Sequence, residues 1–404
     1  MGASGGSILA KVNAGFQWHP AAGLYDGAGR EYFAVPAGPA RSAGPARPAG
    51  PGVIAERPAG LAVALAIAAG SFRVGGAGPG PVGAFETLTS GSSGVPRRIR
   101  RQPASWLASF AVNHGLFGIG PGMVVAVLGR LSQSLALYGA LEGVHLGAQV
   151  HLLEDLRPDR QRRVLAERRV GVLYATPAQA RLLVEAGGSL PDLQFVLIGG
   201  SKLDQGLRAG LAAMAPGAIL HEFYGAAEAS FITLSGPDCP PESVGRAYPR
   251  VKIRVDVAGE IWVKSPYLFE GYADGPGPAR WCEGFLSVGE IGEMRDGYLY
   301  LRGRAGRMVT VADQNVFPEE IEGFLMGLPG VRLAAVVPVA DARRGVHLVA
   351  VVQGDAGQEV AILAALRQRL GALKAPKRLI WLEDWPVLSS GKTDLRAIAD
   401  GVAG

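Results

Sequence analysis

Cysteine is scarce in this sequence. Only two cysteines, Cys239 and Cys282, occur among 404 residues, and they stand in unrelated contexts. They therefore neither frame a disulfide scaffold nor form a metal site, and this usage suits a reducing cytosol. We expect a cytoplasmic protein.

Long apolar runs are also missing. The most apolar early stretch, residues 61–69, is too short to cross a bilayer and favours a buried element. Residues 1–11 lack a positively charged segment followed by a long apolar core, so we expect no signal peptide. The sequence predicts a soluble protein without a membrane span.

The excess of positive charge is small. The chain has 40 basic and 35 acidic residues, a net charge of +5, and a pI near 9.3. The run Arg97, Arg98, Arg100 and Arg101 could bind phosphate, although a solvated surface run is the commoner explanation. Because this run carries no nucleic-acid motif and no interleaved aromatic residues, we expect no nucleic-acid partner.

The length and composition indicate a globular protein of more than one domain. With 48% hydrophobic residues over 404 positions, the chain is too apolar for a disordered protein and too long for one core. Glycine, at 59 residues, and proline, at 28, follow no fixed period, which excludes a collagen-like fibre. Residues 34–60 are rich in proline, glycine, alanine and arginine, and we interpret them as a loop or linker.

Beyond residue 104, helical and strand-like stretches alternate. The strand-like runs are 124–128, 171–174 and 195–198, and the helical ones include 131–141 and 178–185. This alternation predicts an α/β fold with a mainly parallel sheet.

Two further patterns of predicted secondary structure follow towards the C-terminus. From about residue 243 to 304, short strands and turns, including Asp296-Gly297 at a hairpin position, predict a small antiparallel β region. From about residue 306, a helix that begins at Pro318, strands near 333–339 and 346–352, and a helix at 360–370 predict a small α+β domain.

A Gly/Ser-rich segment, residues 89–97, follows a strand-like run at 85–88. Small residues let the backbone approach an anion, and hydroxyls, amides and Arg97 can donate hydrogen bonds to it. The spacing does not fit a Walker loop, and a flexible Gly/Ser loop explains the segment equally well.

A second segment, residues 221–228, carries an aromatic residue, a glycine and a carboxylate close together. Tyr224 could stack on a base and Glu228 could hold a hard cation. Taken alone, the segment also suits an ordinary strand end with a surface glutamate.

In order along the chain, these segments resemble the motifs of the adenylate-forming superfamily, which includes acyl- and aryl-CoA synthetases, carrier-protein adenylation domains and luciferases. The matching segments are 89–97 (phosphate loop), 224–228 (YGxTE), 243–246, 259–261, 289–290 (TGD), 303–304 (GR), 315–322 and 386–392 (PxxxxGK). The resemblance implies a large N-terminal domain of layered α/β sheets over residues 1–304, and a small mobile lid domain over residues 305–404.

The resemblance also implies a role for each matching residue. Lys392, Glu228 and Arg97 would be catalytic: Lys392 and Arg97 would neutralise charge on the phosphates, and Glu228 would hold Mg²⁺. The nucleotide would be bound by Thr89, Ser90, Gly91, Ser92, Ser93, Gly94, Gly200, Ser201, Tyr224, Gly225, Ala226, Ala227, Glu290 and Arg304. The acid pocket would include Gly199 and His114, although a histidine that caps or packs in an apolar segment is at least as common. Without the family, Lys392 is simply a solvated loop lysine.

Several positions depart from the family pattern. Arg97 replaces a lysine, Ala227 a threonine and Glu290 an aspartate, while Gly306 stands where the hinge carboxylate is expected. Asp313 stands near the path that a thiol takes in relatives, so it could obstruct a pantetheine arm. The segment before the phosphate loop is only 88 residues long, which implies a shortened first subdomain. An oligomer contact, such as that of a homodimer, could complete this subdomain, and the shortening could also mark a loss of catalysis.

The activity implied is ATP- and Mg²⁺-dependent conversion of a small-molecule carboxylic acid, whose identity stays open, to an acyl-adenylate, followed by transfer to a thiol, by default CoA. One alternative is an adenylation enzyme that delivers to an acyl carrier protein or an amine without CoA. Another is a non-catalytic adenylate-binding homologue, although the retention of Lys392, Glu228 and Arg304 together argues against it.

Overall fold

The computed structural model describes residues 15–35, 52–76, 78–89, 96–240, 242–311, 314–341, 345–388 and 392–403. The phosphate-loop residues Ser90, Gly91, Ser92, Ser93 and Gly94, and Asp313 near the expected thiol path, lie outside these ranges.

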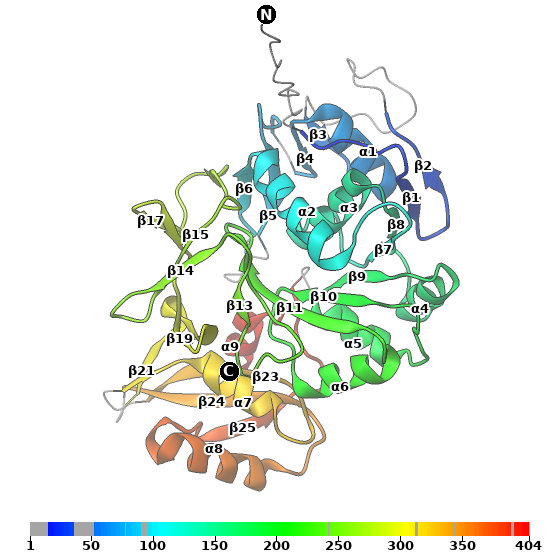
Figure 1. Cartoon of the computed structure of the whole chain (residues 1–404). Helices are drawn as coiled ribbons and strands as arrows, with labels where there is room; N and C mark the ends of the chain where they lie inside the picture. Colours follow the sequence, from blue (N-terminus) through cyan, green and yellow to red (C-terminus); the bar gives the residue numbers. More distant parts are fainter. Residues whose placement is uncertain are drawn as a thin grey trace, which may run out of the picture.

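A large, mainly parallel sheet forms the centre of the molecule (Figure 1). Within the described ranges its order is β13-β12-β11-β10-β9-β7-β8-β1-β2. In that order the strands are β13 (Arg246–Ala247), β12 (Ser230–Leu234), β11 (Ile219–Ala226), β10 (Phe195–Gly199), β9 (Val172–Ala175), β7 (Val124–Val127), β8 (Gln149–Leu152), β1 (Gly23–Asp26) and β2 (Glu31–Tyr32). Strands β1, β8, β7, β9, β10 and β11 run parallel to one another, whereas β2, β12 and β13 are antiparallel to the strands they pair with. The predicted α/β fold with a mainly parallel sheet is confirmed.

Both faces of this sheet are covered. On β7 and β9, Val125 and Val172 belong to one hydrophobic core, whereas the adjacent Ala126 and Leu173 belong to another. Strands of this kind have continuous apolar sequences because both of their faces are buried. The covering helices are α1 (Ala59–Ala69), α2 (Pro103–Phe117) and α3 (Ser134–Leu146) on one side, and α4 (Pro158–Glu167), α5 (Pro177–Glu185) and α6 (Gln205–Met214) on the other. None of the helices in the described ranges combines the length and the apolar character that a membrane span requires.

A second sheet packs over α1 and α2, in the order β16-β6-β5-β4-β3. Its strands are β16 (Gly271–Tyr272), β6 (Arg98–Arg101), β5 (Phe85–Leu88), β4 (Phe72–Val74) and β3 (Val53–Ile54). Strand β3 is buried and pairs in parallel with β4. The interpretation of residues 34–60 as a linker is therefore wrong for this part, because two apolar residues between glycine and proline are too few to show a strand period.

The expected antiparallel β region is present. A four-stranded sheet within the described chain has the order β14 (Lys252–Val255), β15 (Ile261–Lys264), β18 (Phe285–Ser287) and β17 (Arg280–Cys282). Strands β19 (Glu290–Arg295) and β20 (Tyr298–Arg304) form a hairpin. Its two turn residues, Asp296 and Gly297, have φ values of 51° and 79°, as a type I′ turn requires.

The C-terminal part has cores of its own. A short 3₁₀ helix, η1 (Ala305–Arg307), precedes β21 (Val309–Val311), β22 (Gln314–Val316), α7 (Pro318–Met326), β23 (Val331–Asp341), β24 (Gly345–Gly354), α8 (Glu359–Lys374), β25 (Arg378–Trp381) and α9 (Leu395–Ala403). Strands β23, β24 and β25 form one sheet, with apolar clusters on both faces drawn from residues 309–402. In Figure 1 most of this part, coloured yellow to red, lies at the opposite end of the molecule from the N-terminal strands.

Candidate active site

A cavity of about 260 Å³ opens where the carboxyl ends of β9, β10 and β11 meet the C-terminal part. Thr176 follows β9, Gly199 and Gly200 lie at the end of β10, and Gly225 lies near the end of β11. Arg304 and Lys392 line the same cavity from β20 and from the loop before α9. Ligands of open α/β sheets bind at such strand ends.

Local sequence explains how the first of these positions is held. Thr176 is the N-cap of α5: its hydroxyl accepts a hydrogen bond from the Gln179 amide, and the Gln179 side chain accepts one from the Thr176 amide. Pro177 occupies the first helical turn. This capping box ends β9 and starts α5 at one defined residue, so the Thr176 side chain lies at the cavity edge.

Gly225 is required by close backbone contact. A Cβ atom there would lie 2.0 Å from the carbonyl oxygen of Ser230, on the adjacent strand β12. The β11–β12 pairing also shifts register between Tyr224 and Gly225. The turn that follows carries Ala226, Ala227 and Glu228 into the cavity wall.

The Glu228 carboxylate is positioned by one neighbour. The Tyr272 hydroxyl donates a 2.8 Å hydrogen bond to Oε1 of Glu228, and burial, with this carboxylate, raises the Tyr272 pKa. No group of three or more His, Cys, Asp or Glu side chains in the described residues could hold a metal ion. A lone carboxylate does fit Mg²⁺ that is held mainly by substrate phosphates, since Mg²⁺ commonly uses only one or two protein carboxylates.

Two cationic side chains meet at the same end. Oε1 of Glu290 lies 3.0 Å from both Nε and Nη2 of Arg304. Burial alone would lower the Arg304 pKa, but the Glu290 carboxylate outweighs burial and the pKa is raised. Burial, reinforced by Arg304, lowers the Lys392 pKa to about 8, against the opposing pull of Glu290 and Glu228. The charge pattern suits an anion with several negative oxygens.

Tyr224 lies on the other side of β11 from its neighbours Phe223 and Gly225, which line the cavity. Its hydroxyl is buried beside Glu290, without a hydrogen bond of normal geometry to any described residue. Burial and this carboxylate raise the Tyr224 pKa well above its usual value. A buried hydroxyl in this state calls for a further partner, and a nucleotide sugar fits that need.

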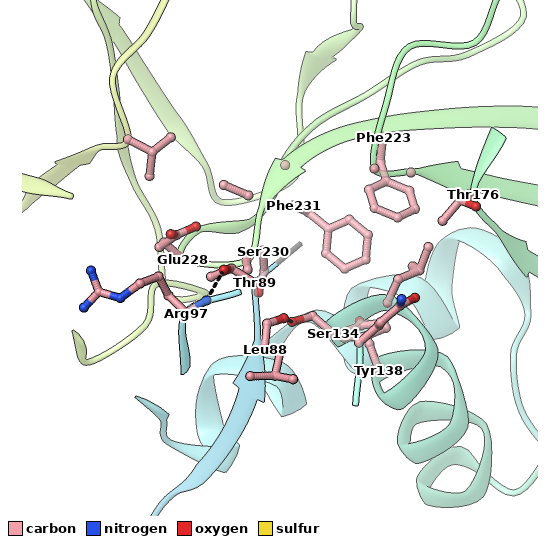
Figure 2. Close-up of a pocket in the computed structure, with 18 of the residues that line it drawn as sticks. Leu88, Thr89, Arg97, Ser134, Tyr138, Thr176, Phe223, Glu228, Ser230 and Phe231 are labelled. Carbon is pink, nitrogen blue, oxygen red and sulfur yellow. Dashed lines mark hydrogen bonds between the residues drawn. The ribbon is translucent and has the colours of Figure 1, made fainter. Parts of the chain in front are cut away.

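The base of the Gly/Ser-rich segment is closed by two hydrogen bonds. The Arg97 amide donates to Oγ1 of Thr89 at 2.8 Å (dashed in Figure 2), and the Thr89 amide donates to the Arg97 carbonyl at 2.8 Å. The Arg97 guanidinium pairs with Asp274 at 2.9 Å and donates to the carbonyls of Gly275 and Pro276. The expected phosphate arginine is thus held on the loop after β16, and in Figure 2 it points away from Phe223.

The structure brings most of the predicted residues together. Those that line the cavity are Thr89, Arg97, Gly199, Gly200, Gly225, Ala226, Ala227, Glu228, Arg304 and Lys392. Tyr224 and Glu290 stand directly behind Arg304, whereas Ser201 is exposed and does not line the cavity.

His114 is not part of the site. It lies exposed in the last turn of α2, and its Nδ1 is 2.7 Å from the carbonyl oxygen of Ile119. The structure does not bring His114 to the cavity lining, and its contact with Ile119 fits the alternative of a structural histidine at a helix end. A histidine in an apolar segment carries no information on which end of the helix meets a cavity.

Sequence reasoning missed the aromatic end of the cavity. Its walls come from α2, α3, β11 and β12, and the residues are Trp106, Leu135, Tyr138, Phe223 and Phe231. The one available signal was Thr176-Pro177, a helix start directly after a predicted strand. The other side chains come from distant segments and only the fold assembles them.

Comparison with known proteins defines the class. Residues 84–273 match the AMP-binding enzyme family, and residues 320–392 match the AMP-binding enzyme C-terminal domain. The chain belongs to this family of adenylate-forming enzymes, and the resemblance inferred from the motifs is confirmed.

Individual relatives agree with this assignment. The uncharacterized acyl-CoA ligase YhfT of Bacillus subtilis (strain 168) is 35% identical over 320 residues, which are 76% of this chain and 66% of that protein. VraA of Staphylococcus haemolyticus (strain JCSC1435), provisionally named a long chain fatty acid-CoA ligase, is 27% identical over 76% of this chain and 67% of its own. The chain thus spans about two thirds of the length of these curated relatives.

Among solved structures, the amide bond synthetase McbA from Marinactinospora thermotolerans has a TM-score of 0.70 and 26% identity, over 81% of this chain and 70% of McbA.

Proposed function

We propose that the protein is an ATP-dependent acid–thiol ligase. It converts a carboxylic acid to an acyl-adenylate with release of pyrophosphate, and then passes the acyl group to the thiol of CoA. The observation that carries the proposal is the convergence of Lys392, Arg304 and Glu228 on one cavity whose other end is apolar. The names of the acyl-CoA ligase relatives support the choice of CoA.

In the first step, a carboxylate oxygen attacks the α-phosphorus of ATP, and the bond from that phosphorus to the bridging oxygen of pyrophosphate breaks. Lys392 and Arg304 place two positive charges where negative charge gathers on the phosphate oxygens. Preorganised charges stabilise such a transition state without forming covalent bonds. The Gly/Ser-rich loop, closed at its base by Thr89 and Arg97, is proposed to hold the β- and γ-phosphates.

Glu228 is proposed to hold Mg²⁺, which would neutralise phosphate charge when bound. Tyr272 orients this carboxylate towards the cavity through its 2.8 Å hydrogen bond. Glu290, with Arg304 and the buried Tyr224 hydroxyl, is proposed to bind the ribose hydroxyls.

In the second step, the thiolate of CoA attacks the acyl carbon and AMP leaves as the phosphate oxygen takes the bonding electrons. We propose that the lid begins after Arg304, at η1, because the cores of residues 309–402 are separate from those of the N-terminal part. Gly306 has no atom within 4 Å of where its Cβ would be, so the pivot carries no packing restraint at this residue.

The test measures pyrophosphate release with a panel of acids, with and without CoA, for the wild type, Lys392→Ala and the exposed control Lys252→Ala. The proposal predicts acid-dependent release and a thioester of the expected mass, both lost in Lys392→Ala and kept in Lys252→Ala. Absence of release with every acid would favour a non-catalytic adenylate-binding protein.

A second candidate is delivery of the acyl group to an amine. The similarity to an amide bond synthetase at 26% identity favours it. Good acid-dependent pyrophosphate release without any thioester, together with an amide product when a primary amine replaces CoA, would select this candidate.

A further inference from the structure

On the side of the cavity away from Arg97 and Glu228, packed aromatic rings form the wall (Figure 2). The rings of Phe223 and Phe231 meet at 4.8 Å and 63°, and those of Phe231 and Tyr138 at 5.1 Å and 79°. Trp106 packs edge-on against Tyr138 at 5.1 Å. Edge-to-face packing of this kind makes a rigid apolar wall that also suits a further ring.

The polar groups of Tyr138 and Trp106 are hydrogen-bonded within the protein. The Tyr138 oxygen lies 2.8 Å from Oγ of Ser109 and 2.9 Å from Oε1 of Glu142. Nε1 of Trp106 donates to Oγ of Ser230 at 3.2 Å. The Tyr138 hydroxyl and the Trp106 indole N–H therefore need no polar partner on the substrate.

A buried polar cluster blocks extension beyond the wall. Glu142 is fully buried and accepts hydrogen bonds from Asn113 (2.8 Å), Tyr138 and Tyr174. The Tyr248 hydroxyl donates in turn to Asn113 at 2.6 Å. An acyl chain that extended between Tyr138 and Phe231 would break these buried hydrogen bonds. The free energy lost with these hydrogen bonds would exceed the free energy gained by burying the chain.

Space is equally limited towards β10. A Cβ on Gly199 would lie 2.3 Å from the Phe223 ring, so the ring already fills the strand end. The adjoining void, which shares Gln133, Leu135 and Thr176 with the main cavity, measures about 10 Å³, room for about one water molecule.

Charge is absent from this end as well. The charged side chains among the described lining residues are Arg97, Glu228, Arg304 and Lys392, all of which belong to the phosphate end described above. A second carboxylate on the substrate would therefore be buried without a counter-ion at the aromatic end, at a cost that excludes it.

We infer that the acid is a compact monocarboxylic acid whose acyl group is uncharged, apolar and about the size of one aromatic ring. The whole cavity, about 260 Å³, must also take the reacting part of the nucleotide, and it is smaller than the pockets typical of drug-sized ligands. This inference rests on the proposed function, because it names the substrate class of the same site.

The test compares kcat/KM for acid-dependent pyrophosphate release with benzoate, adipate and palmitate. Benzoate is expected to exceed each of the other two by about a hundredfold or more, because a long chain or a second charge finds no place behind Phe231. Equal or better use of palmitate or adipate would overturn the inference while leaving the proposed function intact. If no acid supports release, the proposed function fails. Binding of a non-hydrolysable benzoyl-adenylate analogue, measured against its palmitoyl counterpart, then still decides the inference by which of the two binds more tightly.

Leu135→Trp fills the aromatic end from the first turn of α3, and Leu116→Trp, on the exposed end of α2, is the matched control. We expect Leu135→Trp to lower kcat/KM for benzoate relative to kcat/KM for acetate by about tenfold or more, and Leu116→Trp to leave this ratio unchanged. An unchanged benzoate-to-acetate ratio would overturn the inference.

Should Leu135→Trp fail to fold, Phe223→Ala serves in its place, because it enlarges the same end beside Gly199. Phe223→Ala is expected to raise kcat/KM for 2-naphthoate relative to benzoate by about tenfold. No change in that ratio would contradict the assignment of this end to the acyl group.

Discussion

One carboxylate oxygen of Glu290, Oε1, lies 3.0 Å from both Nε and Nη2 of Arg304. The sequence predicted direct contact of Glu290 with ribose, at a position where relatives carry aspartate. In the structure Arg304 lines the cavity, and this oxygen of Glu290 holds its guanidinium. Glu290 therefore fixes the direction of the guanidinium, and the proposed contact with ribose would be made by this pair.

Glu290→Gln tests this relationship. Loss of the negative charge leaves Arg304 less firmly oriented, so we expect KM for ATP to rise about tenfold, with a smaller change in kcat. Steady-state kinetics with varied ATP check this. Glu293→Gln, on the same strand but exposed, is the control. Equal changes in both variants would show that the Glu290–Arg304 pair has no special role.

Strands and turns that their own residues strongly favour could be predicted from the sequence. Strands β7, β9 and β10 lie within one or two residues of the apolar runs, because strands buried on both faces need continuous apolar residues. The Asp296-Gly297 turn was equally clear, because few other pairs accept positive φ at both positions.

Features that depend on distant partners could not be predicted. Strand β3 is a two-residue strand that exists because β4 offers it a neighbour. The aromatic wall needs Phe223 and Phe231 to meet Tyr138 from another element, and no local period records that meeting. Arg97 was predicted from its motif, but Asp274, its partner, lies far along the chain.

The low pKa of Lys392 predicts an alkaline limit to the reaction. Burial, aided by Arg304, brings this pKa to about 8. The positive form is needed to neutralise phosphate charge, so kcat/KM for ATP should fall as the pH rises through about 8. A pH profile of adenylation measures this. Lys392→Arg keeps its positive charge in this pH range, so its kcat/KM should no longer fall as the pH rises through about 8. If the same fall persists in that variant, a group other than Lys392 causes it.

Lys392→Ala should lower adenylation by about a hundredfold or more, since it removes a charge aimed at the transition state. The exposed Lys252→Ala is the control and should leave the rate unchanged. A rate in Lys392→Ala close to that of the control would exclude the assigned role.

Gly225→Ala is expected to disrupt the turn that carries Glu228. The new Cβ would lie 2.0 Å from the Ser230 carbonyl oxygen, which is backbone and cannot rotate away. We expect a loss of about 1–3 kcal/mol in the free energy of unfolding and a fall in kcat of about tenfold or more. Gly217→Ala, where the Cβ meets nothing within 4 Å, provides the control. Denaturant unfolding and kinetics of the two variants would show no difference if the close contact were unimportant.

The buried Glu142 makes stability depend on pH. Burial raises its pKa from 4.5 to about 7, although Tyr174, Asn113 and Tyr138 donate hydrogen bonds that oppose the rise. Between these two values the folded state holds a proton that the unfolded state has lost. The stabilisation is therefore complete below about pH 4.5 and is lost as the pH rises through about 7, by roughly 3 kcal/mol in all.

Glu142→Gln keeps a neutral hydrogen-bonding side chain at every pH. We therefore expect the Tm of the variant, relative to the Tm of the wild type, to be several degrees higher at pH 8.5 than at pH 5.5. Thermal unfolding at the two pH values measures this difference. The exposed Glu167→Gln should give the same difference from wild type at both pH values. A Glu142→Gln variant that is equally destabilised at both would mean that the carboxyl is ionised in the folded protein throughout, with its three hydrogen-bond donors outweighing burial.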